Sequence, residues 1–476
     1  MSVLGVDVGT SRVKAVRFDR DWRAVDSEAV DTTVTTTPDG RSEQDMDQVC
    51  AAVLGVLAAV ASRSPDEVEL VALTAQGDGC WLVDRDGRPV GPALLWNDGR
   101  SAPLISRWQD DGTLQQVFDV CGSLGAAGLA HAQLRWLADE QPELVARADA
   151  LLSCGSWVFA QLTGERVLEA SDAANPFLDA RTGQPDPRVW ELAGIGRLAR
   201  LLPPVVTGTD RIARLTPQAA AQTGLPAGLP VALAPYDVPS TAAGTGATRP
   251  GQAFAVLGTT LCVGIVRNDP HLERPANGMT LPTGVPGRWL LAYATMTGTE
   301  VLDWLAGVMG LDGAAGVMAL AADSTGSTLP LLRPYLSPAG ERSPFLDPAV
   351  RGTLSGLSLR HTRADLARAA VDGLTLAVRD CLDAAGTAER LAVSGGGARS
   401  ELWCQAISDA TGLPIDCPDT DEAGARGAAL VGATAAGMFA DLDTAVDTAV
   451  HPRHTHQPDP AEHARLDGVY RQFRDR

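Results

Sequence analysis

The sequence predicts an α/β protein built from two related domains. Its 476 residues are too many for one hydrophobic core, so two sizeable domains are expected. Strand-like and helix-like segments alternate along the chain, which is typical of a sheet covered by helices. A strand–turn–strand pattern at 4–19 returns at 254–269, and a pattern that occurs only twice indicates two domains rather than a solenoid.

The elements of the first half follow from their residue patterns. Three β-rich runs joined by tight turns predict successive strands: SVLGVDVG, VKAVRFD and RAVDSEAVD. Helical periodicity predicts two helices, and short apolar runs between them predict two more strands. The helices are expected at 45–63 and 129–148, and the strands at 68–74 and 80–84.

The domain boundary is expected near residues 241–252, TAAGTGATRPGQ, because glycine, threonine and proline are typical of a hinge. We therefore predict an N-terminal domain at 1–241 and a C-terminal domain at 242–476. Beyond the hinge, the repeated pattern differs from its first copy in one informative place. Asp7 corresponds to Val256, so only the first copy carries the acid.

The composition excludes several classes of partner. The net charge of −19 opposes binding to nucleic acid, which requires a basic face. Asp7 interrupts the first strand, so no secretory signal is expected, and the longest apolar run, 49–61, is shorter than the ~20 residues of a membrane span. Eight cysteines occur without a CxxC pair, which favours reduced core thiols in the cytoplasm over disulfides or a zinc site.

The two repeated turns are candidates for phosphate binding, because such turns present backbone N–H groups and hydroxyls to phosphate oxygens. The first consists of Gly9, Thr10 and Ser11, and the second of Gly258, Thr259 and Thr260. Lys14, the only lysine in the chain, follows the first turn and would bind phosphate as a point charge. Asp7 would hold Mg²⁺, directly or through water. The alternative is a pair of ordinary hairpin turns. A Walker A loop is absent.

Two further segments carry candidate residues. In VSGGGARSELWCQAISDATGLPI, Gly395, Gly396 and Gly397 join a predicted strand to a helix and allow a ligand to approach the backbone closely; an ordinary strand–helix turn is the alternative. Asp237 ends an apolar run before the hinge. Its carboxylate would take the proton of a hydroxyl that attacks a γ-phosphate, although Asp before Val-Pro is in general more often a turn former.

Residues 74–101 combine short polar side chains with tryptophans, a combination that suits hydroxyl recognition against an aromatic wall. The alternative is a solvated hairpin. The polar candidates are Gln76, Asp78, Asn97, Asp98 and Arg100, beside Trp81 and Trp96. The segment HPRHTHQ (451–457) holds three of the seven histidines; its composition favours a solvated stretch over a metal clip.

One segment has a specific family pattern. Residues 352–372, GTLSGLSLRHTRADLARAAVD, resemble the C-terminal signature of the FGGY family of carbohydrate kinases position by position. AGERSPFLDPAVRG (339–352) and DEAGARGAALVGA (421–433) are similar to the same family, and the resemblance covers nearly the whole chain. QLRWLADEQPE (133–143) matches in part, because Gln133 stands where the family usually has lysine.

The resemblance implies two ribonuclease H-like domains of the actin/Hsp70 type, with a cleft that closes on a sugar and MgATP. It implies that Asp7, Gly9, Thr10, Ser11 and Lys14 form the first phosphate turn, that Gly258, Thr259 and Thr260 approach the γ-phosphate, and that Gly395, Gly396 and Gly397 lie on the adenosine side. It also implies Asp237 as catalytic base, with Asp7 and Asp237 near Mg²⁺. Gln76, Gly77, Asp78, Asp98 and Arg100 would contact or frame the sugar.

The function expected from this resemblance is ATP-dependent phosphorylation of a terminal hydroxyl of a small sugar or polyol. Gly77-Asp78 is more similar to erythritol-type and L-xylulose-type kinases, so the expected substrate is a tetritol or a pentulose. A glycine and a short acid would leave room for a hydroxyl-rich end. The alternatives are an actin- or Hsp70-like ATPase that acts on a protein partner and a catalytically silent sugar-binding regulator. A homodimer is compatible with the sequence.

Overall fold

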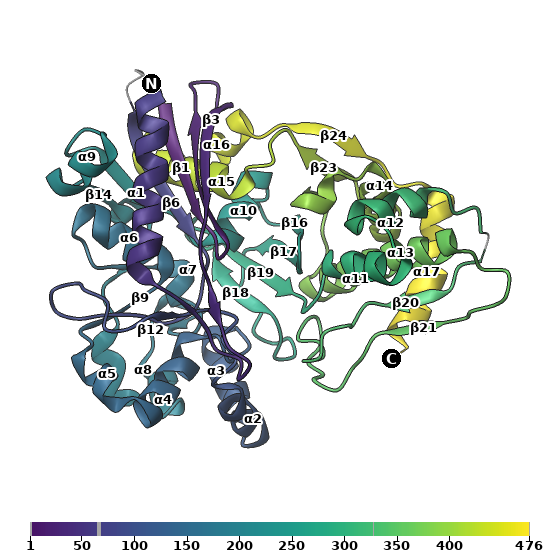
Figure 1. Cartoon of the computed structure of the whole chain (residues 1–476), viewed down its shortest axis with the longest axis horizontal. Helices are drawn as coiled ribbons and strands as arrows, with labels where there is room; N and C mark the ends of the chain where they lie inside the picture. Colours follow the sequence, from purple (N-terminus) through teal and green to yellow (C-terminus); the bar gives the residue numbers. More distant parts are fainter. Residues whose placement is uncertain (1, 64–67, 327, 476) are drawn as a thin grey trace. The chain divides into compact units, whose positions relative to one another are not determined.

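A computed structural model describes residues 2–63, 68–326 and 328–475 (Figure 1). The chain groups into two compact units. Unit 1 comprises the chain up to residue 244 with 268–290 and 422–449, and unit 2 comprises 245–267, 291–421 and the chain from 450. Two segments beyond the predicted boundary at 241/242 therefore group with the N-terminal part of the chain.

The sheet of unit 1 has the strand order β14-β15-β6-β1-β2-β3. β1 and β2 form the predicted antiparallel hairpin, whereas β6 runs parallel to β1 and β15 runs parallel to β6. The carboxyl ends of these three parallel strands therefore lie at one edge of the sheet. The strands are β1 (Ser2–Val8), β2 (Arg12–Phe18), β3 (Ala24–Asp31), β6 (Val68–Ala75), β14 (Ile212–Arg214) and β15 (Pro230–Leu233).

The pleat of β1 sends alternate side chains to two different helices. Leu4, Val6 and Val8 join the core formed with α1 (Met46–Arg63). Gly5 and Asp7 face α15 (Ala423–Ala435) instead, since a Cβ on Gly5 would lie 2.2 Å from the backbone oxygen of Ala425. The edge of the sheet thus carries an apolar layer on one face and an acid on the other.

The predicted helix at 45–63 is confirmed as α1. Among single helices in the described part of the chain, α1 alone is long and apolar enough to cross a membrane by length and composition; α11 (Glu300–Met309) and α12 (Gly313–Ala322) meet the test only as a bent pair. Val49, Val53 and Val60 of α1 are buried in the core of unit 1. A core helix with one apolar face accounts for this composition.

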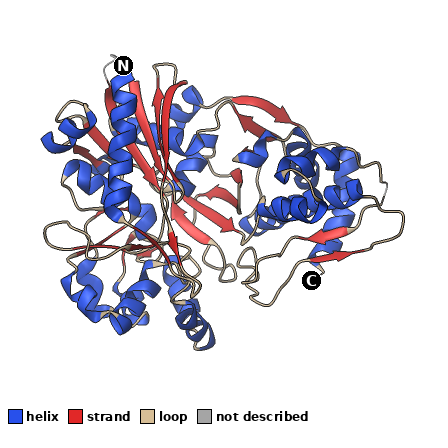
Figure 2. Ribbon diagram, viewed as in Figure 1, coloured by secondary structure: helices blue, strands red, loops and turns tan. Residues whose placement is uncertain are grey.

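The predicted helix at 129–148 is divided in two. Pro142 begins the second helix, because proline lacks the N–H that would continue the first and fits the first turn of a new helix. The remaining elements of unit 1 are short helices and strands (Figure 2). They are β4 (Thr35–Thr36), β5 (Ser42–Gln44), β7 (Trp81–Val83), β8 (Ala93–Leu94), α2 (Ala102–Asp110), α3 (Thr113–Cys121), α4 (Ala130–Glu140), α5 (Pro142–Arg147), β9 (Ala150–Leu152), α6 (Cys154–Thr163), β10 (Leu168–Glu169), α7 (Ala170–Ala173), β11 (Leu178–Asp179), β12 (Gln184–Pro185), α8 (Pro187–Leu192), β13 (Val205–Val206), α9 (Pro217–Thr223), β18 (Met279–Pro282) and α16 (Leu442–Ala449), with α10 (Asp237–Thr245) at its boundary.

Unit 2 repeats the strand arrangement of unit 1. Its sheet contains, in order, β19-β17-β16-β22-β23-β24, with β22 parallel to β16 and β23 parallel to β22. This order corresponds to β3-β2-β1-β6-β15-β14 of unit 1, so the sequence repeat reflects a repeated topology. The strands are β16 (Gln252–Leu257), β17 (Leu261–Arg267), β19 (Trp289–Ala294), β22 (Arg390–Ser394), β23 (Ile415–Pro418) and β24 (Pro452–His456).

The helices of unit 2 cover this sheet. The longest, α13 (Arg363–Ala385), begins at a capping box in which the Thr362 hydroxyl accepts from the backbone N–H of Asp365 and the Asp365 carboxylate accepts from that of Thr362. Its buried face packs with β16 and β17 in one core. The other elements are α11, α12, β20 (Leu331–Arg333), β21 (Thr353–Ser355), α14 (Glu401–Thr411) and α17 (Pro460–Arg474).

The histidine-rich segment forms part of this sheet. Residues 452–456 are the strand β24, antiparallel to β23. The prediction of a solvated stretch is wrong for His456, which is 5% exposed, because the pleat turns it under α14.

Candidate active site

Three of the predicted site segments meet at one edge of the sheet of unit 1. The turn after β1 contains Gly9, and its N–H donates to the carbonyl of Arg12 at 2.9 Å. Gln76 directly follows β6, and Asp237 stands a few residues beyond β15, at the start of α10. Because these strands are parallel neighbours, their following residues converge.

Asp7 lies at the end of β1 against the beginning of α15. A Cβ on Gly424 would come within 2.4 Å of an Asp7 carboxylate oxygen, so glycine is required for this close approach. The pKa of Asp7 is raised to about 6. Burial is the main cause and the nearby Glu422 carboxylate adds to it, whereas the positive charge of Lys14 lowers the pKa. A cation beside Asp7 would stabilise its ionised form and lower this pKa.

Lys14 is the direct cross-strand partner of Asp7 in the β1–β2 hairpin. Its ammonium donates to both carboxylate oxygens of Glu422, at 2.7 and 2.9 Å. Both side chains keep about a quarter of their surface exposed (29% and 24%), so the pair is accessible to a ligand.

Asp237 is the first residue of α10. Burial raises its pKa to about 8, and the negative charges of Asp7 and Asp78 contribute to the shift, whereas the Val238 backbone N–H partly opposes it. A carboxylate whose pKa lies near neutrality is suited to accept a proton during a reaction.

The side chain of Gln76 forms hydrogen bonds with the neighbouring turn and with β5. Its side-chain oxygen accepts from the Thr10 hydroxyl at 2.7 Å, and its amide nitrogen donates to the Gln44 side-chain oxygen at 2.7 Å. The indole of Trp96 donates to the same Thr10 hydroxyl at 3.0 Å. These bonds fix the conformation of the Gly9–Ser11 turn.

The ring of Tyr236 packs against Gly77, on the side where a side chain would stand. A Cβ at this position would lie 2.4 Å from the ring of Tyr236, which fills the space. The glycine is needed so that the ring can pack on the backbone. Asp78 adopts a positive φ of 59°, and its carboxylate accepts a hydrogen bond from the Asn175 amide at 2.7 Å.

Asp98 and Arg100 bind each other inside unit 1. The guanidinium donates from Nε and Nη2 to the two Asp98 oxygens, both at 2.8 Å, and it also binds Glu43. Asp98 additionally accepts from the Ser42 backbone N–H at 2.7 Å. These side chains therefore frame the loop that carries Trp96.

Several residues near this edge were not among the site residues expected from the sequence, although Glu422 lies in the family-like segment 421–433. Asn175, Asp172, Tyr236 and Glu422 come from segments far from the motifs they contact. The pKa of Asp172 is raised well above its usual range by burial, with Glu169, Asp78 and Asp237 adding to the shift. Short-range patterns do not identify such partners, since the contacts form only when distant segments meet.

Unit 2 brings its two glycine turns together in the same way. Val256 near the end of β16 pairs with Ser394 at the end of β22. Gly395 has a φ of +86°, and a Cβ there would lie 2.9 Å from the backbone of Leu257. A Cβ on Gly397 would meet the Trp403 ring at 2.4 Å. The Gly258 carbonyl accepts from the Thr299 N–H at 2.8 Å, which fixes the second turn.

The family of the chain is decided by comparison with known sequences. Residues 2–244 match the N-terminal domain of the FGGY family of carbohydrate kinases, and residues 253–436 match its C-terminal domain. The chain belongs to the FGGY family. Its activity is therefore that of a carbohydrate kinase, an ATP-dependent phosphorylation of a sugar or polyol, as the sequence predicts.

Two relatives and one solved structure illustrate where this FGGY kinase lies in the family. The erythritol kinase of Brucella abortus (strain 2308) is 34% identical, covering 94% of this chain and 90% of its own. The L-xylulose/3-keto-L-gulonate kinase of Escherichia coli (strain K12) is 29% identical, covering 99% and 95%. A crystal structure of a xyloylose kinase from Brucella ovis superposes with a TM-score of 0.90 at 28% identity, covering 99% and 98%.

These likenesses decide between the functions left open by the sequence. The relatives are carbohydrate kinases over nearly the full length of this chain, which favours the kinase over an ATPase acting on a protein or a silent regulator. The two-domain α/β architecture predicted from the sequence is confirmed by the same family.

Proposed function

We propose that this FGGY kinase transfers the γ-phosphoryl group of ATP to a terminal hydroxyl of a four- or five-carbon polyol or ketose. The observation that carries the proposal is Asp237, at the start of α10, whose pKa is raised to about 8 by burial and by Asp7 and Asp78. Relatives named for erythritol and for L-xylulose support the size of the substrate.

Asp237 acts as the general base in this proposal. Its carboxylate accepts the proton of the substrate hydroxyl while the oxygen forms a bond to the γ-phosphorus and the bond to the β-phosphate oxygen breaks, releasing ADP. The neighbouring acids Asp7 and Asp78 raise its proton affinity, which suits a base that must hold the proton until the product leaves.

The residues around Asp7 fit a hard divalent cation. Asp7 and Asp237 offer carboxylate oxygens, the donors that Mg²⁺ prefers. Burial, and secondly the Glu422 carboxylate, raises the pKa of Asp7 to about 6, and a cation would oppose both effects. We assign Mg²⁺ to Asp7 and Asp237, directly or through water. When bound with ATP, Mg²⁺ neutralises charge that develops on the phosphates.

The turns supply the groups that bind the nucleotide. We assign Gly9, Thr10, Ser11 and Lys14 of unit 1 to the phosphates, because the turn is rigidly held and the Lys14 ammonium is partly exposed. In unit 2 we assign Gly258, Thr259 and Thr260 to the γ-phosphate and Gly395, Gly396 and Gly397 to the adenosine side, where the backbone carries no side chain that would obstruct a ligand.

The sugar end is assigned to the surroundings of Asp78. Its carboxylate, oriented by Asn175, would accept hydrogen bonds from substrate hydroxyls, while Gln76, Gly77, Asp98 and Arg100 support the surrounding loops. Erythritol is the first substrate to test, because the erythritol kinase shares 34% identity with this chain against 29% for the L-xylulose kinase.

The proposal is tested by coupled ADP release with MgATP over erythritol, both threitols, D- and L-xylulose, both ribuloses, glycerol and six-carbon ketoses. One strongly preferred four- or five-carbon substrate is expected. Asp237→Asn should abolish sugar-dependent ADP release while ATP binding, measured by calorimetry, persists. Turnover by D237N at the wild-type rate would remove Asp237 from the mechanism, and preference for a hexose would contradict the proposed substrate class.

A further inference from the structure

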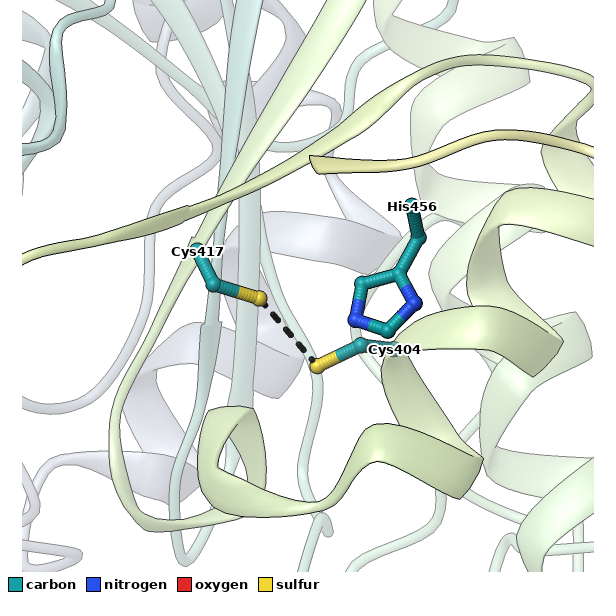
Figure 3. Close-up of side chains that lie close together, drawn as sticks. All are labelled: Cys404, Cys417 and His456. Atoms are coloured by element: carbon teal, nitrogen blue, oxygen red, sulfur yellow. Dashed lines mark hydrogen bonds between the residues drawn. The ribbon is translucent and has the colours of Figure 1, made fainter. Parts of the chain in front are cut away.

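Two thiols and an imidazole converge in unit 2 (Figure 3), where the Cys404 thiol also donates to the carbonyl of Ala398, just after the Gly395–Gly397 turn, at 3.4 Å. Cys404 lies on α14, Cys417 on β23 and His456 on β24. One ligand atom from each lies within 4.8 Å of the others, and all three residues are buried. The pleats of the two strands turn Cys417 and His456 to the face that α14 covers, so three separate elements contribute one side chain each.

The separation of the two sulfurs matches a shared metal ion. The thiol of Cys417 donates to the Cys404 sulfur at 3.6 Å. Two thiolates bonded to tetrahedral Zn²⁺ at about 2.3 Å each are about 3.8 Å apart, so little movement would be needed. A bare thiol–thiol contact also has this length, and the histidine therefore decides between the two interpretations.

His456 presents a nitrogen without a hydrogen-bond partner toward this cluster. Its Nδ1 lies 3.2 Å from the side-chain oxygen of Gln405. The Gln405 amide nitrogen donates to Asp409 and to the carbonyl of Gln457, at 2.8 and 2.9 Å, and these bonds fix which end of the amide faces the ring. The Gln405 oxygen thus accepts the Nδ1 proton, which leaves the lone pair of the neutral ring on Nε2.

The surroundings of Nε2 favour a cation. This atom is buried and has no hydrogen-bond partner among the described residues. It lies 3.3 Å from a carboxylate oxygen of Glu401, one turn before Cys404 on α14. Because the ring proton lies on Nδ1, toward Gln405, the lone pair of Nε2 faces the Glu401 carboxylate oxygen with no proton between them. Protonation or a metal ion would resolve this arrangement.

We infer that Cys404, Cys417 and His456 bind a zinc-like transition-metal ion, with the fourth position directed toward Glu401 and His454. Two sulfurs and an imidazole select borderline and soft metals such as Zn²⁺ over Mg²⁺ or Ca²⁺. Glu401 and His454 are exposed and form a second group with His456 within 4.8 Å, which supplies an oxygen or nitrogen donor on the solvent side. The inference is independent of the proposed function.

A metal at this position would have a structural role. Its ligands tie β24, from the last segment of the chain, to α14 and β23 of the same unit. The hydrogen bond from Nδ1 to Gln405 is the type of contact that orients a metal-binding histidine. The scattered cysteines and the histidine-rich segment, each uninformative alone in the sequence, form one site in the fold.

The test is Co²⁺ and Zn²⁺ binding by the full chain, reduced and stripped with a chelator under anaerobic conditions. The expected result is uptake of about one Co²⁺ per chain with thiolate-to-cobalt charge transfer and tetrahedral d–d bands, displaced by Zn²⁺. C404S, C417S and H456Q should lose these bands. C381S, a buried cysteine in α13, and H451Q, an exposed histidine in the same segment, serve as matched controls and should keep them.

Gln405→Met keeps all ligands and removes only the acceptor for Nδ1, so it remains informative if a ligand variant fails to fold. Metal affinity should fall about 10- to 100-fold in Q405M. Absence of the charge-transfer band in fully reduced wild-type protein would overturn the inference, as would equal binding by the ligand variants and the controls. Formation of a Cys404–Cys417 disulfide with no metal uptake under any condition would also overturn it.

Discussion

The only lysine of the chain donates to both carboxylate oxygens of a residue 408 positions away: the ammonium of Lys14 lies 2.7 and 2.9 Å from Glu422. Lys14 also stands opposite Asp7 in the β1–β2 hairpin. One cation is thus placed between two carboxylates at the edge where the phosphate turn is proposed. Phosphate oxygens would compete with Glu422 for this ammonium.

Replacing Lys14 with methionine is expected to impair catalysis much more than folding. A partly exposed ion pair contributes at most about 1 kcal/mol, so the free energy of unfolding should change by no more than that. Loss of one charge-stabilising donor typically reduces kcat by about 10²- to 10³-fold. Steady-state kinetics and urea unfolding measure the two effects on the same protein.

The control for K14M is Arg63→Met. Arg63 lies at the end of α1 in unit 1 and pairs with Asp26 and Glu28. The R63M variant therefore also loses an ion pair of unit 1. R63M should retain wild-type kcat. Equal kinetics in K14M and wild-type protein would exclude Lys14 from the phosphate site and leave it a structural partner of Glu422.

The stability of unit 1 is expected to fall as pH rises because of Asp237. The folded pKa of about 8 lies above the ordinary value of 3.8, so between these values the folded state holds a proton that the unfolded state has released. One such carboxyl lowers the free energy of unfolding by up to about 1.4 kcal/mol per pH unit in this window. Below pH 4 the stabilisation is fully present, and above about pH 8 it is lost.

Urea unfolding of wild-type protein and D237N from pH 4 to pH 9 isolates this contribution. The wild-type free energy of unfolding should decline more steeply with pH than that of D237N, because asparagine does not titrate while all other groups remain. Parallel curves for the two proteins would show that the carboxyl of Asp237 titrates normally in the folded chain.

The residues at the ends of β1 and β2 could be predicted from the sequence, but the side chains that contact them from distant segments could not. Strand periodicity and the Gly-Thr-Ser turn place Asp7 and Lys14 in one hairpin, since neighbouring strands fix their own register. Tyr236 and Asn175 reach the same edge from distant segments, and no local pattern marks them. The family-like segment 421–433 contains Glu422, but nothing in it indicates the contact with Lys14. The break between α4 and α5 was present in the sequence as Pro142, but the helical periodicity on both sides concealed it.

A residue that the sequence marks for ligand approach can also be required for packing. Gly395 was predicted to allow close approach to a ligand. The structure shows an additional need for glycine at this position, because a Cβ would lie 2.9 Å from the backbone of Leu257.

The cluster in unit 2 could not be predicted from the sequence. Cys404, Cys417 and His456 belong to three elements, and their convergence depends on the pairing of β23 with β24. Composition alone therefore favoured dispersed thiols.

Asp78→Asn is expected to shift the pH dependence of kcat/KM. The negative charge of Asp78 raises the pKa of Asp237, so its removal should move the acidic limb of the profile toward lower pH. A loss of substrate contacts would lower kcat/KM at all pH values without moving the limb. The profile with the preferred substrate therefore separates an electrostatic role from a purely binding role.

Asp110→Asn provides the matched control for D78N. Asp110 is an exposed carboxylate at the end of α2 and is not among the groups that shift the pKa of Asp237. Its profile should coincide with that of the wild-type enzyme. A limb that stays in place in D78N would mean that another group sets the pH dependence.

Gly77→Ala is expected to destabilise the protein through one identified clash. The added Cβ would lie 2.4 Å from the buried Tyr236 ring, and overpacking of this kind typically costs about 1–3 kcal/mol. Removing the ring should relieve the clash, so the cost of G77A should be smaller in a Y236A background. Denaturant unfolding of wild-type protein, G77A, Y236A and the double variant measures the coupling between the two positions. An unchanged cost of G77A without the Tyr236 ring would show that glycine is required at position 77 for a reason other than this contact.

Gly55→Ala is the matched control for G77A. Nothing lies within 4 Å of the added Cβ at this position of α1, so the substitution should stabilise the helix by up to about 1 kcal/mol because alanine has the higher helix propensity. The same denaturant unfolding measures this effect.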